Sequence, residues 1–105
     1  MSTRPLKLHS SVGRRGRNIP FDVRLVQERL NELAKGRHKL KVTGRVGART
    51  LAALWDFQKS VVGFKIPDTK VDMTGKTIEA LETRASAWKW AQTLKPRPHG
   101  SIYNP

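Results

Sequence analysis

Few of the residue types that perform catalysis occur in this sequence at a spacing that catalysis requires. His9, His38 and His99 lie far apart and form no His-Glu-x-x-His arrangement, so we expect no metal site. The run Gly75-Lys76-Thr77 matches the end of a phosphate-binding loop, but that motif needs an earlier glycine where Lys70 stands. No Gly-x-Ser-x-Gly nucleophile elbow is present. We therefore predict a protein that is not an enzyme and has no cofactor.

The carboxylates lack the arrangement of a glycoside hydrolase, in which two acids converge on one cleft. Most of them fall on the polar faces of the helices that the sequence predicts, where solvated surface charge is the expected role. These acids are Asp22, Glu28, Glu32, Asp56, Glu79 and Glu82.

Amide, aromatic and basic side chains remain as candidates for binding a ligand. Gln27 and Gln58 lie at the margins of apolar stripes, where an amide usually satisfies nearby backbone groups. Trp88 continues an apolar face and is expected in the core. Trp55 and Trp90 are expected to be partly exposed, where an aromatic ring could stack on a sugar or anchor a protein partner.

Three helices must position these residues, at about 21–35, 47–62 and 75–93. Each segment places apolar residues three and four positions apart, which makes one apolar stripe on a helix. Asp22 is expected to cap the first helix, and Gly36 to end it in the left-handed conformation. The predicted core contains Val23, Val26, Leu30, Leu51, Leu54, Phe57, Ile78 and Leu81.

Two similar turns precede the second and third helices. Arg49–Leu54 reads RTLAAL and Lys76–Leu81 reads KTIEAL, each after a valine and a glycine. A glycine turn followed by a threonine that bonds the first helical turn accounts for both. We therefore predict that Gly44 or Gly47 has a positive φ angle.

These motifs resemble, in order and spacing, the peptidoglycan-binding domain of bacterial and phage cell-wall hydrolases. The resemblance rests on DVRLVQERLNEL, VTGRVGARTLAALWDFQ and VDMTGKTIEAL, and it covers about residues 12–81. It implies an all-α, compact three-helix bundle and a noncatalytic module that targets a hydrolase, phage or secretion-system component to the wall. The chain departs from the family at Thr43, Val46 and Ala48, and its second turn is compressed to DMTGKT.

The groove implied by this resemblance lies near the turn before the second helix and the start of the third. It nominates Arg45, Arg49, Trp55 and Lys76 as peptidoglycan-binding residues. Trp90 and Tyr103 are the candidates for binding a protein partner, such as a cell-wall hydrolase.

The charge balance keeps two other functions open. The 105 residues include 21 Lys and Arg against 8 Asp and Glu, a formal net charge of +13 that favours polyanionic partners. A basic trihelical protein that binds nucleic acid is one alternative, although the helices lack a dense face for reading bases. An adaptor that docks onto a larger protein machine is the other.

The ends of the chain differ in composition from its middle. We expect an irregular basic segment at 1–17, the helical domain at 18–95 and a proline-rich tail at 96–105. No apolar run is long enough to span a membrane, and the basic start lacks the apolar stretch of a signal peptide. A wall-binding product, complete or an N-terminal module, would be made in the cytoplasm. It would reach the periplasm or cell wall by lysis, a secretion apparatus or a fused partner.

Overall fold

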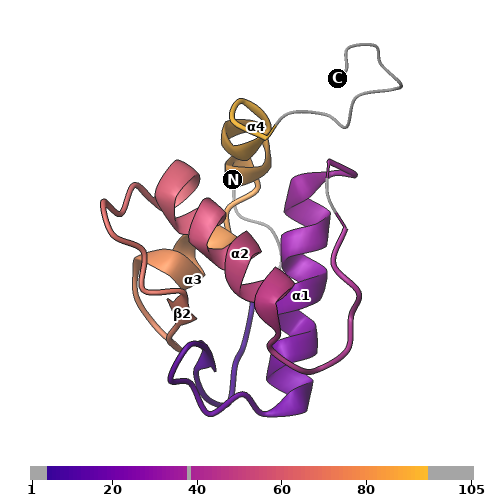
Figure 1. Cartoon of the computed structure of the whole chain (residues 1–105). Helices are drawn as coiled ribbons and strands as arrows, with labels where there is room; N and C mark the ends of the chain where they lie inside the picture. The colour runs from indigo at the N-terminus through magenta and orange to yellow at the C-terminus, as the bar shows by residue number, and fades with distance from the viewer. Residues whose placement is uncertain (1–4, 38, 95–105) are drawn as a thin grey trace.

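The structure, a computed structural model, describes residues 5–37 and 39–94. They form a mostly helical molecule with one short two-stranded sheet, which confirms the helical prediction at that level (Figure 1). His38, His99, Tyr103 and the predicted tail at 96–105 lie outside the described residues. Within them, no helix is long and apolar enough to cross a bilayer.

Helix α1 (Pro20–Ala34) is close to its predicted bounds, but its first turn differs from the prediction. Pro20 stands at the start, where its missing N–H costs nothing, and the N-cap residue is Ile19. Asp22 makes no capping bond and is fully buried, so its prediction as a cap was wrong. The helix ends as predicted in left-handed residues, at Lys35 (φ 49°) and Gly36 (φ 84°).

The second predicted helix consists of two parts. Helix α2 (Ala48–Phe57) begins after Gly47 and continues into one π-helical turn, η1 (Gln58–Val62). The amide of Gly63, at φ 94°, donates to the carbonyl of Gln58 over 2.9 Å and closes this turn. The wider turn begins at Gln58 and ends the helix at Val62.

The third predicted helix is broken into α3 (Lys76–Leu81) and α4 (Ala85–Ala91). Side chains satisfy the carbonyls where the break occurs. The Arg29 guanidinium donates to the Leu81 oxygen over 2.7 Å, and the Ser86 hydroxyl donates to the Ala80 oxygen over 2.7 Å. The break rotates α4 relative to a continuous helix, so the predicted face of the extension was wrong.

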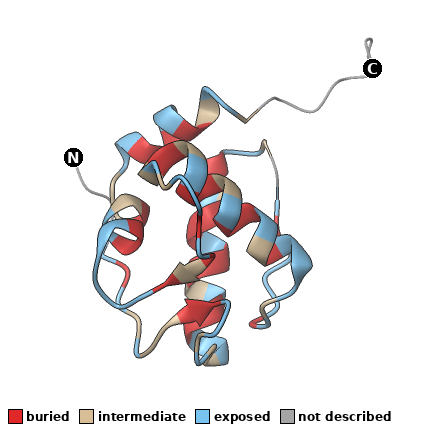
Figure 2. Cartoon of the chain, turned by 60° about the vertical axis from the view of Figure 1, so that its left-hand side comes forward, coloured by how far each residue is buried: buried red, intermediate tan, exposed pale blue. Residues whose placement is uncertain are grey.

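The core lies between α1 and the other helices, whose buried residues face inward (Figure 2). All the predicted core residues are buried except Leu51, which is half-buried. Phe57 and Trp90 meet edge to face at its centre, with ring centroids 4.9 Å apart. That geometry is a favoured one for an aromatic pair.

The segment before α1 has no helix, as predicted, but it packs against the core. Leu6 and Val12 are buried. Strand β1 (Val12–Gly13) pairs antiparallel with β2 (Lys70–Val71). The Asp22 carboxylate accepts the backbone N–H groups of His9 and Ser10 at 3.1 and 2.9 Å, so Asp22 holds this segment in place.

Candidate functional site

The first turn, defined here as residues 43–50, is built around the side chain of Gln27. This amide lies inside the molecule, and its oxygen accepts the N–H groups of Thr43 and Gly44 at 2.9 and 3.0 Å. Its nitrogen donates to the Arg45 carbonyl at 3.0 Å and to the Thr50 hydroxyl at 3.1 Å. The predicted role of Gln27, satisfying nearby backbone, is confirmed.

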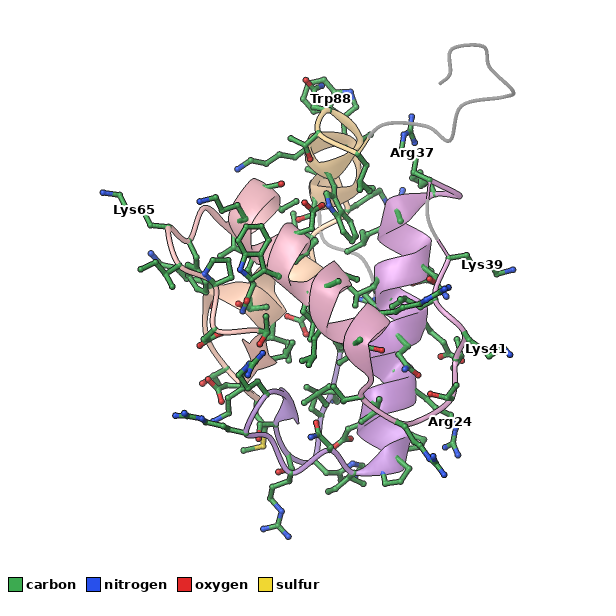
Figure 3. All side chains as sticks on the ribbon, viewed as in Figure 1. Arg24, Arg37, Lys39, Lys41, Lys65 and Trp88 are labelled. Carbon is green, nitrogen blue, oxygen red and sulfur yellow. The ribbon has the colours of Figure 1, made fainter. Side chains whose placement is uncertain are left out.

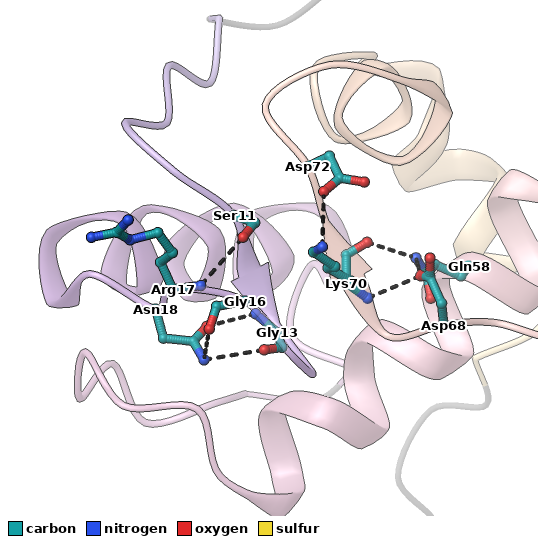
Figure 4. Close-up of polar contacts among 9 residues, drawn as sticks. All are labelled: Ser11, Gly13, Gly16, Arg17, Asn18, Gln58, Asp68, Lys70 and Asp72. Carbon is teal, nitrogen blue, oxygen red and sulfur yellow. Dashed lines mark hydrogen bonds and ion pairs between the residues drawn. The ribbon is translucent and has the colours of Figure 1, made fainter.

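The second turn, defined here as residues 68–77, is built in the same way around Gln58. The amide oxygen accepts the Thr69 N–H at 2.8 Å. The amide nitrogen donates to the Asp68 carboxylate at 2.9 Å and to the Lys70 carbonyl at 3.1 Å (Figure 4). It also donates to the Thr77 hydroxyl at 3.1 Å. The prediction for Gln58 is confirmed as well.

The two turns have the same arrangement at their first three residues. Gly44 and Thr69 follow the first residue of each turn and have positive φ angles of 81° and 56°, which confirms the prediction for Gly44. The Arg45 N–H donates to the Thr43 hydroxyl at 3.1 Å, and the Lys70 N–H donates to the Asp68 carboxylate at 3.0 Å. The sequence repeat is therefore also a repeat of structure.

The second turn is longer than the first, not compressed as the sequence suggested. It starts at Asp68, four residues before the DMTGKT run, and reaches its helix threonine at Thr77. Asp68, and not Asp72, makes the bond in the second turn that Thr43 makes in the first.

A groove lined by basic residues runs beside the first turn and along α2. We call it the basic groove. At the turn it is a hollow of about 420 Å³ whose lining includes Gln27, Lys41, Arg45 and Arg49. Further along α2 the lining includes Lys39, Leu40, Ala52, Asp56 and Leu94.

The far wall of the basic groove is the segment at 39–41. The Asn31 side chain fixes it, accepting the Leu40 N–H at 2.6 Å and donating to the Leu40 carbonyl at 2.9 Å. Leu40 is thereby turned into the core, while Lys39 and Lys41 project into solvent (Figure 3).

Four cations line the basic groove, namely Lys39, Lys41, Arg45 and Arg49. Among the described residues, ion pairs join His9 to Asp22, Arg29 to Glu32 and Lys70 to Asp72. None of the four cations of the groove takes part in these pairs. The carboxylate at the far end of the groove belongs to Asp56, which accepts the Trp90 indole N–H at 2.7 Å. The groove therefore carries a net positive charge.

A second hollow, of about 480 Å³, lies beside the second turn. We call it the tryptophan hollow, and its lining consists of Arg14, Arg15, Trp55, Pro67, Asp68, Thr69 and Lys70.

The residues nominated from the sequence are divided among three places. Arg45 and Arg49 lie together in the basic groove, whereas Trp55 lines the tryptophan hollow. Lys76, at the start of α3, belongs to neither lining. Arg14, Arg15, Lys39 and Lys41 were missed, because only their basic character is visible in the sequence.

The burial of Trp88 and Trp90 is the reverse of the prediction. Trp90, nominated as a partner-binding residue, is 0% exposed and packs on Phe57. Trp88, expected in the core, is 72% exposed on α4 (Figure 3). The break between α3 and α4 causes this reversal, since it changes which side of α4 faces the core.

Three acids predicted to be solvated have structural partners instead. Asp22 and Asp56 accept the bonds described above, and Glu82 accepts the Leu6 N–H at 2.7 Å. In the part of the chain that the structure describes, no group of three or more His, Cys, Asp and Glu could hold a metal ion.

Comparison of the chain with protein-family models, curated proteins and solved structures found no match.

Proposed function

We propose that the protein is a noncatalytic module that binds peptidoglycan in the basic groove. The stem peptides of this polymer offer carboxylates and amides, which arginine and lysine recognise through charge-assisted hydrogen bonds. The observation that carries the proposal is that Arg45 and Arg49 line one hollow together, with no acidic partner among the described residues.

The first turn supports this proposal because the backbone that carries Arg45 and Arg49 is ordered before any ligand binds. Gln27 holds the Arg45 carbonyl and the Thr50 hydroxyl, and these residues flank Arg49 in the sequence. A preordered backbone lowers the entropy lost on binding.

The departures from the family pattern leave the first turn intact. Thr43 stands where the family has aspartate, and its hydroxyl accepts the Arg45 N–H as the Asp68 carboxylate accepts that of Lys70. Val46, in the place of the family's phenylalanine, is half-buried and packs against the core. The first turn therefore keeps the bonding of the second at the position where threonine replaces the family's aspartate.

The formal charge of +13 favours the second candidate, nucleic-acid binding, because any polycation attracts a polyanion at low salt. The dependence of binding on salt concentration distinguishes the two candidate functions. Attraction between exposed charges reaches only about 8 Å at physiological ionic strength, so unspecific binding should fall steeply as salt rises. Binding in a fitted groove should persist.

The test is cosedimentation with purified sacculi stripped of teichoic acid, at moderate and high salt, with duplex DNA as competitor. We expect the protein to stay with the sacculi at moderate salt despite excess DNA. Arg45→Gln and Arg49→Gln should each weaken binding roughly tenfold, the effect of losing one charge-assisted bond.

Arg84→Gln is the matched control for charge, because Arg84 is exposed and lies outside the linings of both hollows. It should bind like the parent protein. Sedimentation that DNA abolishes, with all three variants alike, would contradict the peptidoglycan proposal and favour nucleic acid.

A further inference from the structure

The tryptophan hollow joins three segments that are distant in sequence. The loop at 13–18 supplies Arg14 and Arg15, α2 supplies Trp55, and the second turn supplies residues from Asp68 to Lys70. Because the proposed function uses the basic groove, it leaves this hollow without a role.

The loop at 13–18 is held against the second turn by backbone contacts. The Arg14 N–H donates to the Thr69 carbonyl at 2.9 Å. Gly13, at φ 115°, approaches so closely that a Cβ there would lie 2.1 Å from the Thr69 oxygen. Only glycine permits this approach, so the position of the arginines is fixed by the fold.

Asn18 closes the loop from inside (Figure 4). Its side-chain oxygen accepts the Gly13 N–H at 2.7 Å, and its nitrogen donates to the carbonyls of Gly13 and Gly16 at 3.1 and 3.2 Å. Arg14 and Arg15 therefore stand on an ordered turn at the rim of the hollow.

The side chains of the hollow combine one aromatic ring with several cations. Trp55 is 45% exposed, and the Lys59 ammonium lies 5.7 Å from the centroid of its ring. Arg15 forms no ion pair with another described residue. The one acid of the lining, Asp68, accepts the bonds from Gln58 and the Lys70 N–H at its Oδ1. Three cations of the lining outnumber it, namely Arg14, Arg15 and Lys70.

An indole beside arginines suits a ligand with a flat apolar face and a carboxylate a few bonds away. A sugar ring that carries an acid group has this combination, since the ring stacks on the indole and the carboxylate accepts from guanidinium. A nucleic-acid strand needs successive aromatic rings along a basic track. The lining holds only Trp55 as an aromatic, and the exposed Trp88 belongs to α4, so the hollow fits a single acidic sugar better.

We propose that the tryptophan hollow binds the acidic sugar of a glycan strand from which the peptide has been removed. This inference rests on the proposed function, because it places both ligands in the same polymer. In intact peptidoglycan the lactyl carboxyl group of the muramic acid residue forms an amide bond with the stem peptide and carries no charge. Hydrolysis of that amide adds water across the C–N bond and leaves the free carboxylate on the sugar and the amine on the peptide. An amidase reaction must therefore supply the ligand.

The test is a titration of the ¹⁵N-labelled protein followed by NMR. The indole signal of Trp55 is assigned by Trp55→Phe, and the probes are N-acetylmuramic acid, its methylamide and N-acetylglucosamine. We expect the free acid to shift the Trp55 indole and the amides of Arg14 and Arg15. The two neutral sugars should need at least about tenfold higher concentration, because they lack the charge-assisted bond.

Variants of the loop at 13–18 distinguish binding in the hollow from nonspecific attraction to positive charge. The double variant Arg14→Gln/Arg15→Gln should lose the response to the acid at least about tenfold. Arg17→Gln removes a charge from the same loop outside the lining and should respond like the parent protein. Equal responses to the acid and its methylamide, or an unchanged double variant, would overturn the inference. A Trp55 shift with oligothymidylate below the concentration needed for the sugar acid would overturn it too.

The two proposals fail in different ways. Arg45→Gln/Arg49→Gln should lose sacculus binding while the Trp55 response to N-acetylmuramic acid remains. Sacculus binding without any Trp55 response would overturn the inference and leave the proposed function standing. A Trp55 response without sacculus binding would support the sugar site and contradict the basic groove as the wall-binding surface.

Discussion

Two buried glutamines carry most of the polar bonding that shapes the turns. Gln27 and Gln58 each accept from backbone N–H groups and donate to a backbone carbonyl and a threonine hydroxyl. A glutamine is suited to this because one planar amide presents an acceptor and two donors. Neither glutamate nor lysine could replace both functions.

Gln58→Ala should destabilise the fold, because it leaves the buried Thr69 N–H and Thr77 hydroxyl without their partner. Each unsatisfied buried group costs about 1–3 kcal/mol, so chemical denaturation should show a loss in that range or above it. Gln58→Glu keeps the acceptor but turns a buried carboxylate toward the Asp68 carboxylate and the Lys70 carbonyl, so it should destabilise at least as much as Gln58→Ala. Gln92→Ala, at an exposed glutamine, serves as the control. Equal stability of Gln58→Ala and Gln92→Ala would refute the role of Gln58.

The glycines of the first turn allow a matched comparison. Gly44 has φ 81°, and a Cβ there would lie 3.3 Å from the Pro20 carbonyl oxygen, whereas Gly47 has φ −114° and open space around it. Gly44→Ser should cost about 1–2 kcal/mol, the penalty of a left-handed conformation. Gly47→Ser should cost little, because serine is a good N-cap residue for α2. Thermal melts of both variants test this, and equal losses would contradict it.

At the scale of elements, the first two helices could be predicted because their signals are local. The apolar stripe of α1 and the glycine before α2 are both visible in the sequence. The break between α3 and α4 has no such signal, since Glu82, Thr83 and Arg84 include neither glycine nor proline. The Arg29 bond that occupies the last carbonyl of α3 comes from 52 positions away, which no local pattern reveals.

The same limit explains what was missed in the candidate site. The sequence could place Arg45 and Arg49 in one site because both belong to the first turn. Arg14 reaches the hollow beside Trp55 of α2 because the loop at 13–18 contacts the second turn, which is distant in sequence. A spread of basic residues along the chain gives no indication of such a contact.

The break makes the two tryptophans of α4 a test of the fold. Trp90→Ala should destabilise by about 3–5 kcal/mol, because it removes the partner of Phe57 and leaves a cavity in the core. Trp88→Ala should change stability by less than about 0.5 kcal/mol, as is usual for an exposed side chain. Urea unfolding of both variants would show the contrast, and the reverse order would mean that α4 faces the other way.

At the scale of the whole molecule, the N-terminal segment bonds to parts of the fold that are distant from one another in sequence. Residues 9 and 10 bond to Asp22 in α1, Leu6 bonds to Glu82 after α3, and β1 pairs with β2. The segment was predicted as a basic irregular end. Its bonds instead run to α1, to the residue that follows α3 and to strand β2, so the loop bearing Arg14 and Arg15 has a fixed place on the molecule.

The glutamine bonds also have a consequence for hydrogen exchange. The amide protons of Thr43, Gly44 and Thr69 lie in loops, yet each is donated to a side chain that is itself inside the molecule. Exchange at these amides requires the turn to leave its glutamine, which an opening of the loop alone does not achieve. They should therefore exchange with deuterium as slowly as amides in the middle of α1. The backbone of the turns that carries the cations would then leave its folded conformation only rarely.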